Sequence, residues 1–310
     1  MLNVKGAKTD MLRNQTDAFL KTLAKTIEVN VEDLEVKVSA ELEFYILDGN
    51  KQKLDKKLNE SRELKNIIYM LNTYDEKIRR SNKNNFIRME SFEDEDGFNQ
   101  FEVQFIPTNN PIELAESINN FKQTIQEICK NVNDDYFVDF RAKPFDDEPT
   151  SSLHYHISVY YKGANLFAKD DPRDEDEYYY LPLYWCIAGL LELMPKFMKF
   201  FAPTENCRER YWLPKREERY IHYPTKICWG FNNRTCAIRI PRKPSEDPLN
   251  CRIEHRVSSS MADPYLSLFA IFCGMQYGVA QELECPEPVY SRAYEDDDAG
   301  KPIFECFNDK

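Results

Sequence analysis

Residues 34–48, LEVKVSAELEFYILD, alternate apolar and polar side chains. One face collects apolar side chains from Leu34 to Ile46, and the opposite face carries polar ones, among them Glu41 and Glu43. Because successive side chains of a strand point to opposite faces, this period of two predicts a strand with one buried face. The stretch therefore predicts a sheet that is covered on one side and polar on the other.

Helices and further strands are expected around this strand. Asp10 can cap a helix that ends near Glu28, and helical spacing is expected over about 64–71, 111–131, 178–201 and 264–281. Strands are expected within 99–105, 136–142, 153–161, 236–241 and 251–257. An acidic stretch, 90–97, leads into the first of these, 170–177 is an acidic connection, and the tail 282–310 is loosely ordered. Since no βαβ alternation is present, the fold class is α+β, with a mainly antiparallel sheet and helices packed on one side.

Composition excludes several kinds of site. The chain has 9 glycines, and their spacing forms neither a GxGxxG nor a GxxxxGK phosphate loop. Metals and side chains would therefore have to hold any nucleotide phosphates. The net charge of −12 argues against sequence-independent binding to nucleic acid, which needs Lys and Arg to neutralise phosphates.

Cysteine usage and hydropathy favour a cytoplasmic protein without a membrane partner. The 9 cysteines form no CxxC pair, which is typical of free thiols in a reducing compartment. The first residues contain no basic–apolar leader, and the most apolar run, 265–280, is too short to span a bilayer. Within that run, Gly274 and Gly278 are expected to permit close helix packing.

Polar side chains recur at alternate positions in four of the expected strands. They are Glu41 and Glu43; Gln100, Glu102 and Gln104; His154, His156 and Ser158; and Arg252, Glu254 and Arg256. Each pattern alone is compatible with a solvated sheet surface or a hydrogen-bonding pair. Together they combine carboxylates and imidazoles, which suit Mg²⁺ or Mn²⁺, with arginines, which suit phosphate and carboxylate oxygens. This combination fits phosphoryl transfer without a glycine loop.

Five segments, in chain order, resemble motifs of the glutamine synthetase family. ELEFYILD (41–48) is similar to the family's E-x-E-F strand, and EDGFNQFEVQF (95–105) to its second glutamate motif. FRAKPF (140–145), LHYHISVY (153–160) and NLF (165–167) resemble its K-P…H-x-H-x-S segment. WGFNNRTCAIRIP (229–241) and RIEHRVSSSMADPYLSL (252–268) resemble its N-R-T/S…I-R-I-P and R-I-E-x-R…A-N-P-Y-L segments. The resemblance covers about 35–280 and leans to the gamma-glutamylpolyamine synthetases.

The resemblance implies a catalytic domain with a curved sheet and an ATP-dependent ligase that uses two or more Mg²⁺ or Mn²⁺ ions. ATP would phosphorylate the side-chain carboxylate of glutamate or a similar acid, and ammonia or an amine would then form an amide. One metal would bind Glu43, Glu95 and Glu102, with Glu93 or Asp94 as alternatives to Glu95. The other metal would bind Glu41, His154 and Glu254.

The same motifs imply residues for the substrate and the nucleotide. Arg210, from NCRER, Arg234 and Arg256 would grip glutamate and its acyl phosphate. Arg239 and Arg252 would face the ATP phosphates, although Arg239 could also be an exposed strand residue. Glu90, His156 and Ser158 would lie near the nucleotide.

The chain also departs from the family pattern. It is expected to form a single domain, 1–310, without the family's N-terminal β-grasp domain, so a ring-shaped oligomer is doubtful. The loop 148–152, EPTSS, lacks the expected glycine, and the basic segment 210–226 shows no P-G-x-E-A-P flap, with His222 nearest the missing glutamate. The family's C-terminal helices are cut short at Lys310. These departures keep two alternatives open, namely a non-catalytic nucleotide- or metal-binding relative and one chain of a split ligase.

Overall fold

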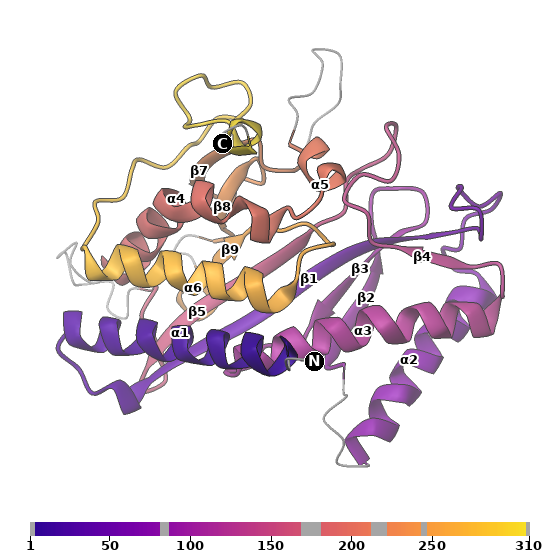
Figure 1. The fold of residues 1–310 in the computed structure, drawn as a ribbon, viewed down its shortest axis with the longest axis horizontal. Coiled ribbons are helices and arrows are strands. Elements are labelled where there is room, and N and C mark those ends of the chain that lie inside the picture. Colours follow the sequence, from indigo (N-terminus) through magenta and orange to yellow (C-terminus); the bar gives the residue numbers. More distant parts are fainter. Residues whose placement is uncertain (1–3, 81–86, 169–180, 212–221, 243–246, 308–310) are drawn as a thin grey trace.

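The computed structural model describes residues 4–80, 87–168, 181–211, 222–242 and 247–307 (Figure 1). Strand β1 (Leu34–Leu47) is the longest strand and lies inside the sheet, with β3 on one side and β5 on the other. Its apolar side chains, from Leu34 to Ile46, are buried, whereas Glu41 and Glu43 on the opposite face are only partly covered. The strand predicted from the alternation of apolar and polar side chains is therefore confirmed.

The strands form one open sheet in the order β2-β3-β1-β5-β9-β8-β7. These are β2 (Met89–Asp94), β3 (Gln100–Phe105), β5 (Leu153–Tyr161), β9 (Ile253–His255), β8 (Cys236–Ile240) and β7 (Lys226–Phe231), with β4 (Phe137–Asp139) and β6 (Ala164–Asn165) paired to β1 and β5. Only β7 and β8 are parallel among the described pairs. The expected α+β class with a mainly antiparallel sheet is confirmed.

Four long helices gather on one face of the sheet (Figure 1). They are α1 (Val4–Thr26), α3 (Pro111–Val132), α4 (Leu181–Phe201) and α6 (Pro264–Ala280). The amphipathic helix α2 (Arg62–Arg80) packs on α3, and the short α5 (Glu205–Glu209) follows α4. The helices bury the apolar face of the strands in one continuous core, so the polar face is left for chemistry.

The backbones of helices α4 and α6 lie very close together where glycines of the two helices meet. A Cβ atom at Gly278 would lie 1.9 Å from the Trp185 carbonyl oxygen, and one at Gly189 would lie 2.1 Å from the Gly274 carbonyl oxygen. Both distances are far below any contact that a methyl group tolerates. The close packing expected from Gly274 and Gly278 is confirmed.

Several expected boundaries are wrong. Helix α1 begins at Val4, so Asp10 lies inside the helix, where it pairs with Arg13, and does not cap it. The acidic stretch 90–97, in which no strand was expected, contains most of β2, because its Phe92 packs on the core while its charged side chains are exposed at the sheet edge. Strand β7 was not expected as a strand, because its apolar run gives no clear alternation.

The tail is also more ordered than expected. Residue 303 is buried, and its N–H donates to the Thr225 carbonyl at 2.9 Å. The Ile227 N–H donates to the Lys301 carbonyl at 2.8 Å, and the Val289 N–H to the Trp229 carbonyl at 2.8 Å. The tail therefore completes the hydrogen bonding of β7, a long-range pairing that a local acidic pattern does not reveal.

The acidic loop 170–177 lies outside the described residues. Among the helices that are described, none is both long enough and apolar enough to cross a bilayer.

Candidate metal and phosphate site

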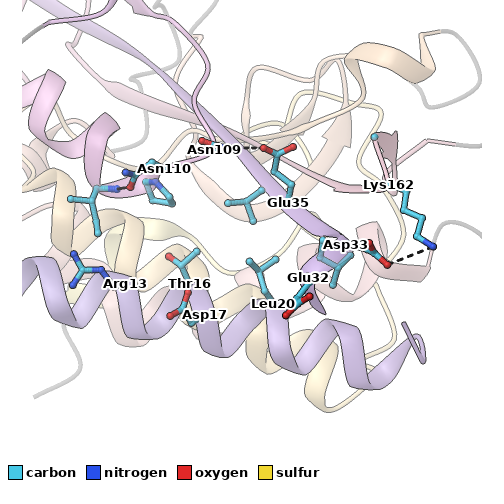
Figure 2. Close-up of a pocket in the computed structure, with 15 residues that line it drawn as sticks. Arg13, Thr16, Asp17, Leu20, Glu32, Asp33, Glu35, Asn109, Asn110 and Lys162 are labelled. Atoms are coloured by element: carbon cyan, nitrogen blue, oxygen red, sulfur yellow. Dashed lines mark hydrogen bonds and ion pairs between the residues drawn. The ribbon is translucent and has the colours of Figure 1, made fainter. Parts of the chain in front are cut away.

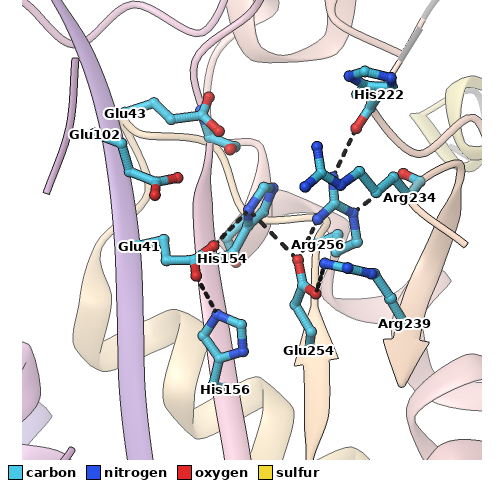
Figure 3. A network of polar contacts seen from close by, with 12 residues as sticks. Glu41, Glu43, Glu102, His154, His156, His222, Arg234, Arg239, Glu254 and Arg256 are labelled. Carbon is cyan, nitrogen blue, oxygen red and sulfur yellow. Dashed lines mark hydrogen bonds and ion pairs between the residues drawn. The ribbon is translucent and has the colours of Figure 1, made fainter. Parts of the chain in front are cut away.

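The polar face brings together side chains from β1, β3, β5, β8 and β9 (Figure 3). The strand register places them opposite one another: Glu43 faces Glu102, Glu41 faces His154, and Glu254 faces both His156 and Arg239. Opposed residues on one face of an antiparallel pair have Cβ atoms only about 4.5–5.5 Å apart. Residues distant in the sequence therefore form one connected polar surface.

Three carboxylates, Glu43, Glu95 and Glu102, form what we call the three-carboxylate cluster. Each offers an oxygen atom, and these atoms lie within 4.8 Å of one another. Glu95 follows β2 directly, whereas its neighbours Glu93 and Asp94 are exposed and are not part of the cluster. The structure thus brings together the three residues that the family resemblance groups, in a donor set that suits a hard divalent cation.

Crowding and burial shift the pKa values of this cluster upward. Burial, with the Glu95 carboxylate added, raises the pKa of Glu43 to about 7. Burial and the charges of Glu41 and Glu43 raise the pKa of Glu102 to about 8. Burial also raises the pKa of Glu95. Because like charges resist ionisation together, a divalent cation that bound here would relieve the repulsion and favour the charged forms.

Glu41, His154, His156 and Glu254 form a second group, the histidine cluster. Ligand atoms of Glu41, His156 and Glu254 lie within 4.8 Å of one another. His156 Nε2 lies 3.0 Å from Glu41 Oε1, and His154 Nδ1 lies 3.6 Å from Glu41 Oε2 and 3.8 Å from Glu254 Oε1. The group of mutually close ligand atoms therefore contains His156, whereas the expected His154 lies beside the same two carboxylates.

Opposite charges lower the pKa values of the two carboxylates in the histidine cluster, whereas burial lowers that of His154. Burial alone would raise the pKa of Glu41, but the neighbouring His156 and His154 outweigh it and hold the pKa below its ordinary value. Burial likewise opposes ionisation of Glu254, yet Arg256 and the histidines lower its pKa to about 2. Burial, helped by the Arg256 charge, lowers the pKa of His154 to about 4. His154 is thus neutral at pH 7, the form that binds metals.

Arginines surround the histidine cluster. Arg239 Nη1 donates to Glu254 Oε2 at 2.7 Å, its Nη2 donates to Asn232 Oδ1, and Arg256 Nη1 donates to Glu254 Oε1. Arg252 Nε donates to His156 Nδ1 at 3.1 Å. The buried Glu254 carboxylate is thus paired with two guanidinium groups, which makes this end of the surface suited to phosphate oxygens. Arg239 is ion-paired there, so it is not a free surface residue.

The remaining expected substrate arginines differ in placement. Arg234 lies beside Arg256, whose Nε donates to the Arg234 carbonyl at 3.2 Å, and its charge acts on Glu95 (Figure 3). Arg210 is 1% exposed and donates to the Ser258 and Arg256 carbonyls. The structure therefore places Arg234 at the site surface and Arg210 beneath it.

Two expected nucleotide residues lie outside both clusters. Ser158 is buried on β5 opposite Lys37, one alternate position beyond His156. Glu90 is an exposed residue at a bulge in the edge strand β2. Their roles stay predictions.

Two functional contacts were missed from the sequence. The Ser152 N–H donates to Glu43 Oε2 at 2.9 Å, and Gln104 Nε2 donates to Glu102 Oε1 at 3.1 Å. The i, i+2 spacing of Glu102 and Gln104 could have indicated the second contact, whereas nothing local indicates the first. The loop 148–152 does not need the expected glycine conformation, because no residue of this described loop has a positive φ.

A separate hollow of about 690 Å³ lies between α1 and the start of β1 (Figure 2). None of the expected site residues lines it, and several of its polar groups bond within the chain. Asn109 Nδ2 donates to Glu35 Oε1 at 2.6 Å, and Lys162 lies 3.5 Å from Asp33. The expected site residues that the structure describes therefore lie apart from this hollow.

Comparisons with known proteins agree with the fold and the motif order. The family described as "Glutamine synthetase, catalytic domain" matches residues 19–305. Gamma-glutamylputrescine synthetase PuuA of Escherichia coli (strain K12) is 32% identical over 206 residues, 66% of this chain and 40% of that protein. Glutamate–methylamine ligase of Methyloversatilis universalis is 28% identical over 201 residues, 65% of this chain and 43% of that protein. The chain thus spans less than half the length of these relatives.

Among solved structures, one described as "GmaS/ADP complex-Conformation 1" superimposes with a TM-score of 0.71 at 19% identity. The match covers 94% of this chain and 66% of that one. At this identity the likeness concerns the fold.

Proposed function

This chain belongs to the glutamine synthetase catalytic-domain family, and we propose that it takes part in ATP-dependent amide formation. In the proposed reaction a carboxylate, glutamate or a similar acid, attacks the γ-phosphorus of ATP and releases ADP. Ammonia or an amine then attacks the acyl phosphate, so that the C–N bond forms and phosphate leaves. The observation that supports this proposal is the presence of two adjacent clusters of oxygen and nitrogen ligands, flanked by arginines, on one sheet face.

The two clusters suit two divalent ions, Mg²⁺ or Mn²⁺. Glu43, Glu95 and Glu102 would hold one ion, and Glu41, His154 and Glu254 the other, with His156 as a further nitrogen at the second position. When bound, such ions draw phosphate oxygens together and neutralise their charge. Gln104 and Ser152 would orient the Glu102 and Glu43 oxygens by donating hydrogen bonds to them.

The arginines would stabilise the charge that develops on the phosphoryl group. Arg239 and Arg252 lie beside the histidine cluster, where they would face the ATP phosphates, and Glu90, His156 and Ser158 would lie towards the nucleotide. Arg234 and Arg256 lie side by side next to Glu254 (Figure 3) and would grip the carboxylate substrate and its acyl phosphate. Bidentate guanidinium contacts suit both groups.

We propose an amine, in preference to ammonia, as the nucleophile. The two named relatives join amines, putrescine or methylamine by their names, to glutamate. The segments NNRT (232–235) and RIEHR (252–256) also resemble the amine-using branch of the family more than the ammonia-using members. The P-G-x-E-A-P flap motif, whose glutamate would deprotonate ammonium, is not recognisable in the sequence between Arg210 and Lys226.

The test is ADP release by the full chain with Mg²⁺ or Mn²⁺, glutamate, and a panel of ammonia, methylamine and diamines. ADP and amide should form in equal amounts and only when all components are present. The Glu102→Gln variant is the matched control, because it replaces one carboxylate ligand with an amide of nearly the same shape. Tight ATP binding without ADP formation under every combination would instead support the non-catalytic or split-ligase alternatives.

A further inference from the structure

The segment between β7 and β8, residues 232–235, contacts or carries three arginines of the polar face. Asn232 Oδ1 accepts a hydrogen bond from Arg239 Nη2 at 2.7 Å. The Arg234 carbonyl accepts one from Arg256 Nε at 3.2 Å, and the Arg234 side chain belongs to the segment itself. A movement of this segment would therefore displace three guanidinium groups together.

The two flanking strands hold this segment through few backbone contacts. Asn232 has a φ of 49°, in the left-handed region that asparagine adopts more readily than most residues. Its N–H donates to the Ile240 carbonyl at 2.8 Å, whereas the Cys236 N–H donates to the Asn233 carbonyl at 3.3 Å, which is long for such a bond. Other contacts are therefore needed to fix the segment.

Asn233 connects the segment to the tail, which returns to β7 after α6 (Figure 1). Its Nδ2 donates to the Val289 carbonyl at 2.9 Å and to the Ser291 carbonyl at 2.8 Å. Its Oδ1 accepts the Thr235 N–H at 3.1 Å and Thr235 Oγ1 at 2.7 Å. One amide thus uses both of its donors on the tail and both of its acceptor positions on the segment.

Thr235 and Gly230 complete the contact with the tail. Thr235 Oγ1 accepts the Ala293 N–H at 2.8 Å, and both residues are buried. A Cβ atom at Gly230 would lie 2.4 Å from the Val289 carbonyl oxygen, so the glycine allows the tail to lie directly on β7. The tail is therefore both packed and hydrogen-bonded against the part of the chain that carries the arginines.

We propose that Asn233 and Thr235 are positioning residues: by holding the tail against residues 232–235, they fix the three arginines that would face the phosphoryl group. The proposal rests on the proposed function in taking these arginines as phosphate-binding groups. It also gives the tail a role that its acidic sequence does not indicate. Guanidinium groups stabilise a phosphoryl transition state only in the right orientation, and a displacement of about 1 Å can cost about 100-fold in rate.

The test compares Thr235→Val with Thr235→Ser in the full chain. Valine has the shape of threonine but no oxygen to accept the Ala293 N–H, whereas serine keeps that oxygen. Asn233→Ala removes the amide that joins the segment to the tail. Ser291→Ala is the matched control, because its hydroxyl donates to Asp296 Oδ2 within the tail, and its carbonyl, which accepts from Asn233, is unchanged.

Three quantities are measured for each variant. ADP release gives kcat and KM for ATP, calorimetry gives the affinity for adenosine 5′-(β,γ-imido)triphosphate with Mn²⁺, and denaturant unfolding shows that the variant is folded. We expect kcat to fall about 10–100-fold in Thr235→Val and Asn233→Ala, and the affinity for the analogue to fall with it. Thr235→Ser should recover most of kcat, and Ser291→Ala should behave as the wild type does.

A purely structural role predicts a different pattern. Folded Thr235→Val and Asn233→Ala proteins with a lower unfolding midpoint but wild-type kcat and analogue affinity would overturn the proposal. Equal losses in Thr235→Val and Thr235→Ser would also overturn it, because serine retains the acceptor oxygen. If one of the two disruptive variants does not fold, the other decides.

Failure of the proposed function gives a separate result. Wild-type protein that binds the analogue but releases no ADP contradicts the ligase, and the analogue affinities of the variants then decide the positioning role. Wild-type protein that binds no analogue rejects the assignment of the arginines to phosphate and, with it, this inference.

Discussion

Glu43 on β1 lies directly opposite Glu102 on β3 in the antiparallel register. Two carboxylates that face each other are unfavourable unless one is protonated or a cation lies between them. Two positions earlier on β1, Glu41 instead faces His154 and lies near a pair of arginines bonded to Glu254. The negative charge of the three-carboxylate cluster, at one end of the polar surface, is therefore uncompensated. The charge of the histidine cluster, at the other end, is already balanced.

Glu102→Gln should stabilise the metal-free protein at alkaline pH. The pKa of Glu102 is about 8 in the folded chain and 4.5 ordinarily, so the folded state favours the protonated form. This preference for protonated Glu102 stabilises the folded wild type fully below pH 4.5, and the stabilisation is lost as pH rises to about 8. A pKa difference of one corresponds to about 1.4 kcal/mol, so we expect a gain of roughly 2–4 kcal/mol at pH 8.5 from denaturant unfolding with chelator present.

At pH 4 the same variant should match the wild type, because Glu102 is then neutral in both states. The exposed Glu32→Gln change is the control and should alter stability at neither pH. An equal gain at pH 4 and pH 8.5 would contradict the electrostatic explanation and indicate better packing of the amide.

Mn²⁺ binding to the three-carboxylate cluster should strengthen as pH rises from 6 to 8.5. Glu43 and Glu102, with pKa values of about 7 and about 8, must lose their protons before they can coordinate an ion. Calorimetric titration in buffers of different ionisation enthalpy measures the protons released, and we expect about one to two per ion at pH 7. A release of zero protons at pH 7 would show that both carboxylates are already ionised.

Much of this arrangement could be predicted from the sequence because strands reveal their faces locally. The alternation in 34–48 predicts both the buried face and the side on which Glu41 and Glu43 lie. Glu102 and Glu254 follow from the same reasoning, since each shares a face with polar residues two positions away. Their grouping into clusters follows from the resemblance to a family, because the sequence of a single strand does not reveal which strands lie next to it in the sheet.

The parts that were missed depend on contacts across long stretches of sequence. Arg210 donates to two backbone carbonyls that lie 46 and 48 residues further along the chain, contacts that its own motif does not indicate. The tail pairs with β7 through backbone groups, which carry no side-chain signature. The capping expected of Asp10 is wrong because helix α1 already begins at Val4, six residues earlier, where its Lys8 pairs with Asp263 at the start of α6.

Glu254→Gln should both abolish activity and lower stability. The Glu254 carboxylate is fully buried and pairs with Arg239 and Arg256, so a neutral amide leaves two guanidinium groups less compensated. Removing one partner from a buried pair typically costs roughly 3–5 kcal/mol. Denaturant unfolding and ADP release should therefore change together, and adding Arg239→Met should restore part of the stability but no activity. Unchanged stability in Glu254→Gln would show that the arginines do not depend on this carboxylate.

His154→Ala and His156→Ala form a matched pair that separates the two imidazoles of the histidine cluster. His154 Nδ1 lies between the Glu41 and Glu254 carboxylates, and burial lowers its pKa to about 4, so its ring is a neutral ligand at pH 7. His156 receives the Arg252 Nε–H on Nδ1, so in a neutral ring Nε2 carries the proton and faces Glu41 as a donor. We therefore expect His154→Ala to weaken Mn²⁺ binding to the histidine cluster at least about 10-fold, and His156→Ala to raise KM for ATP with a smaller effect on the metal. Mn²⁺ titration with and without ATP measures both quantities. The reverse order of effects would make His156 the ligand, with Arg252 released from it when the ion binds.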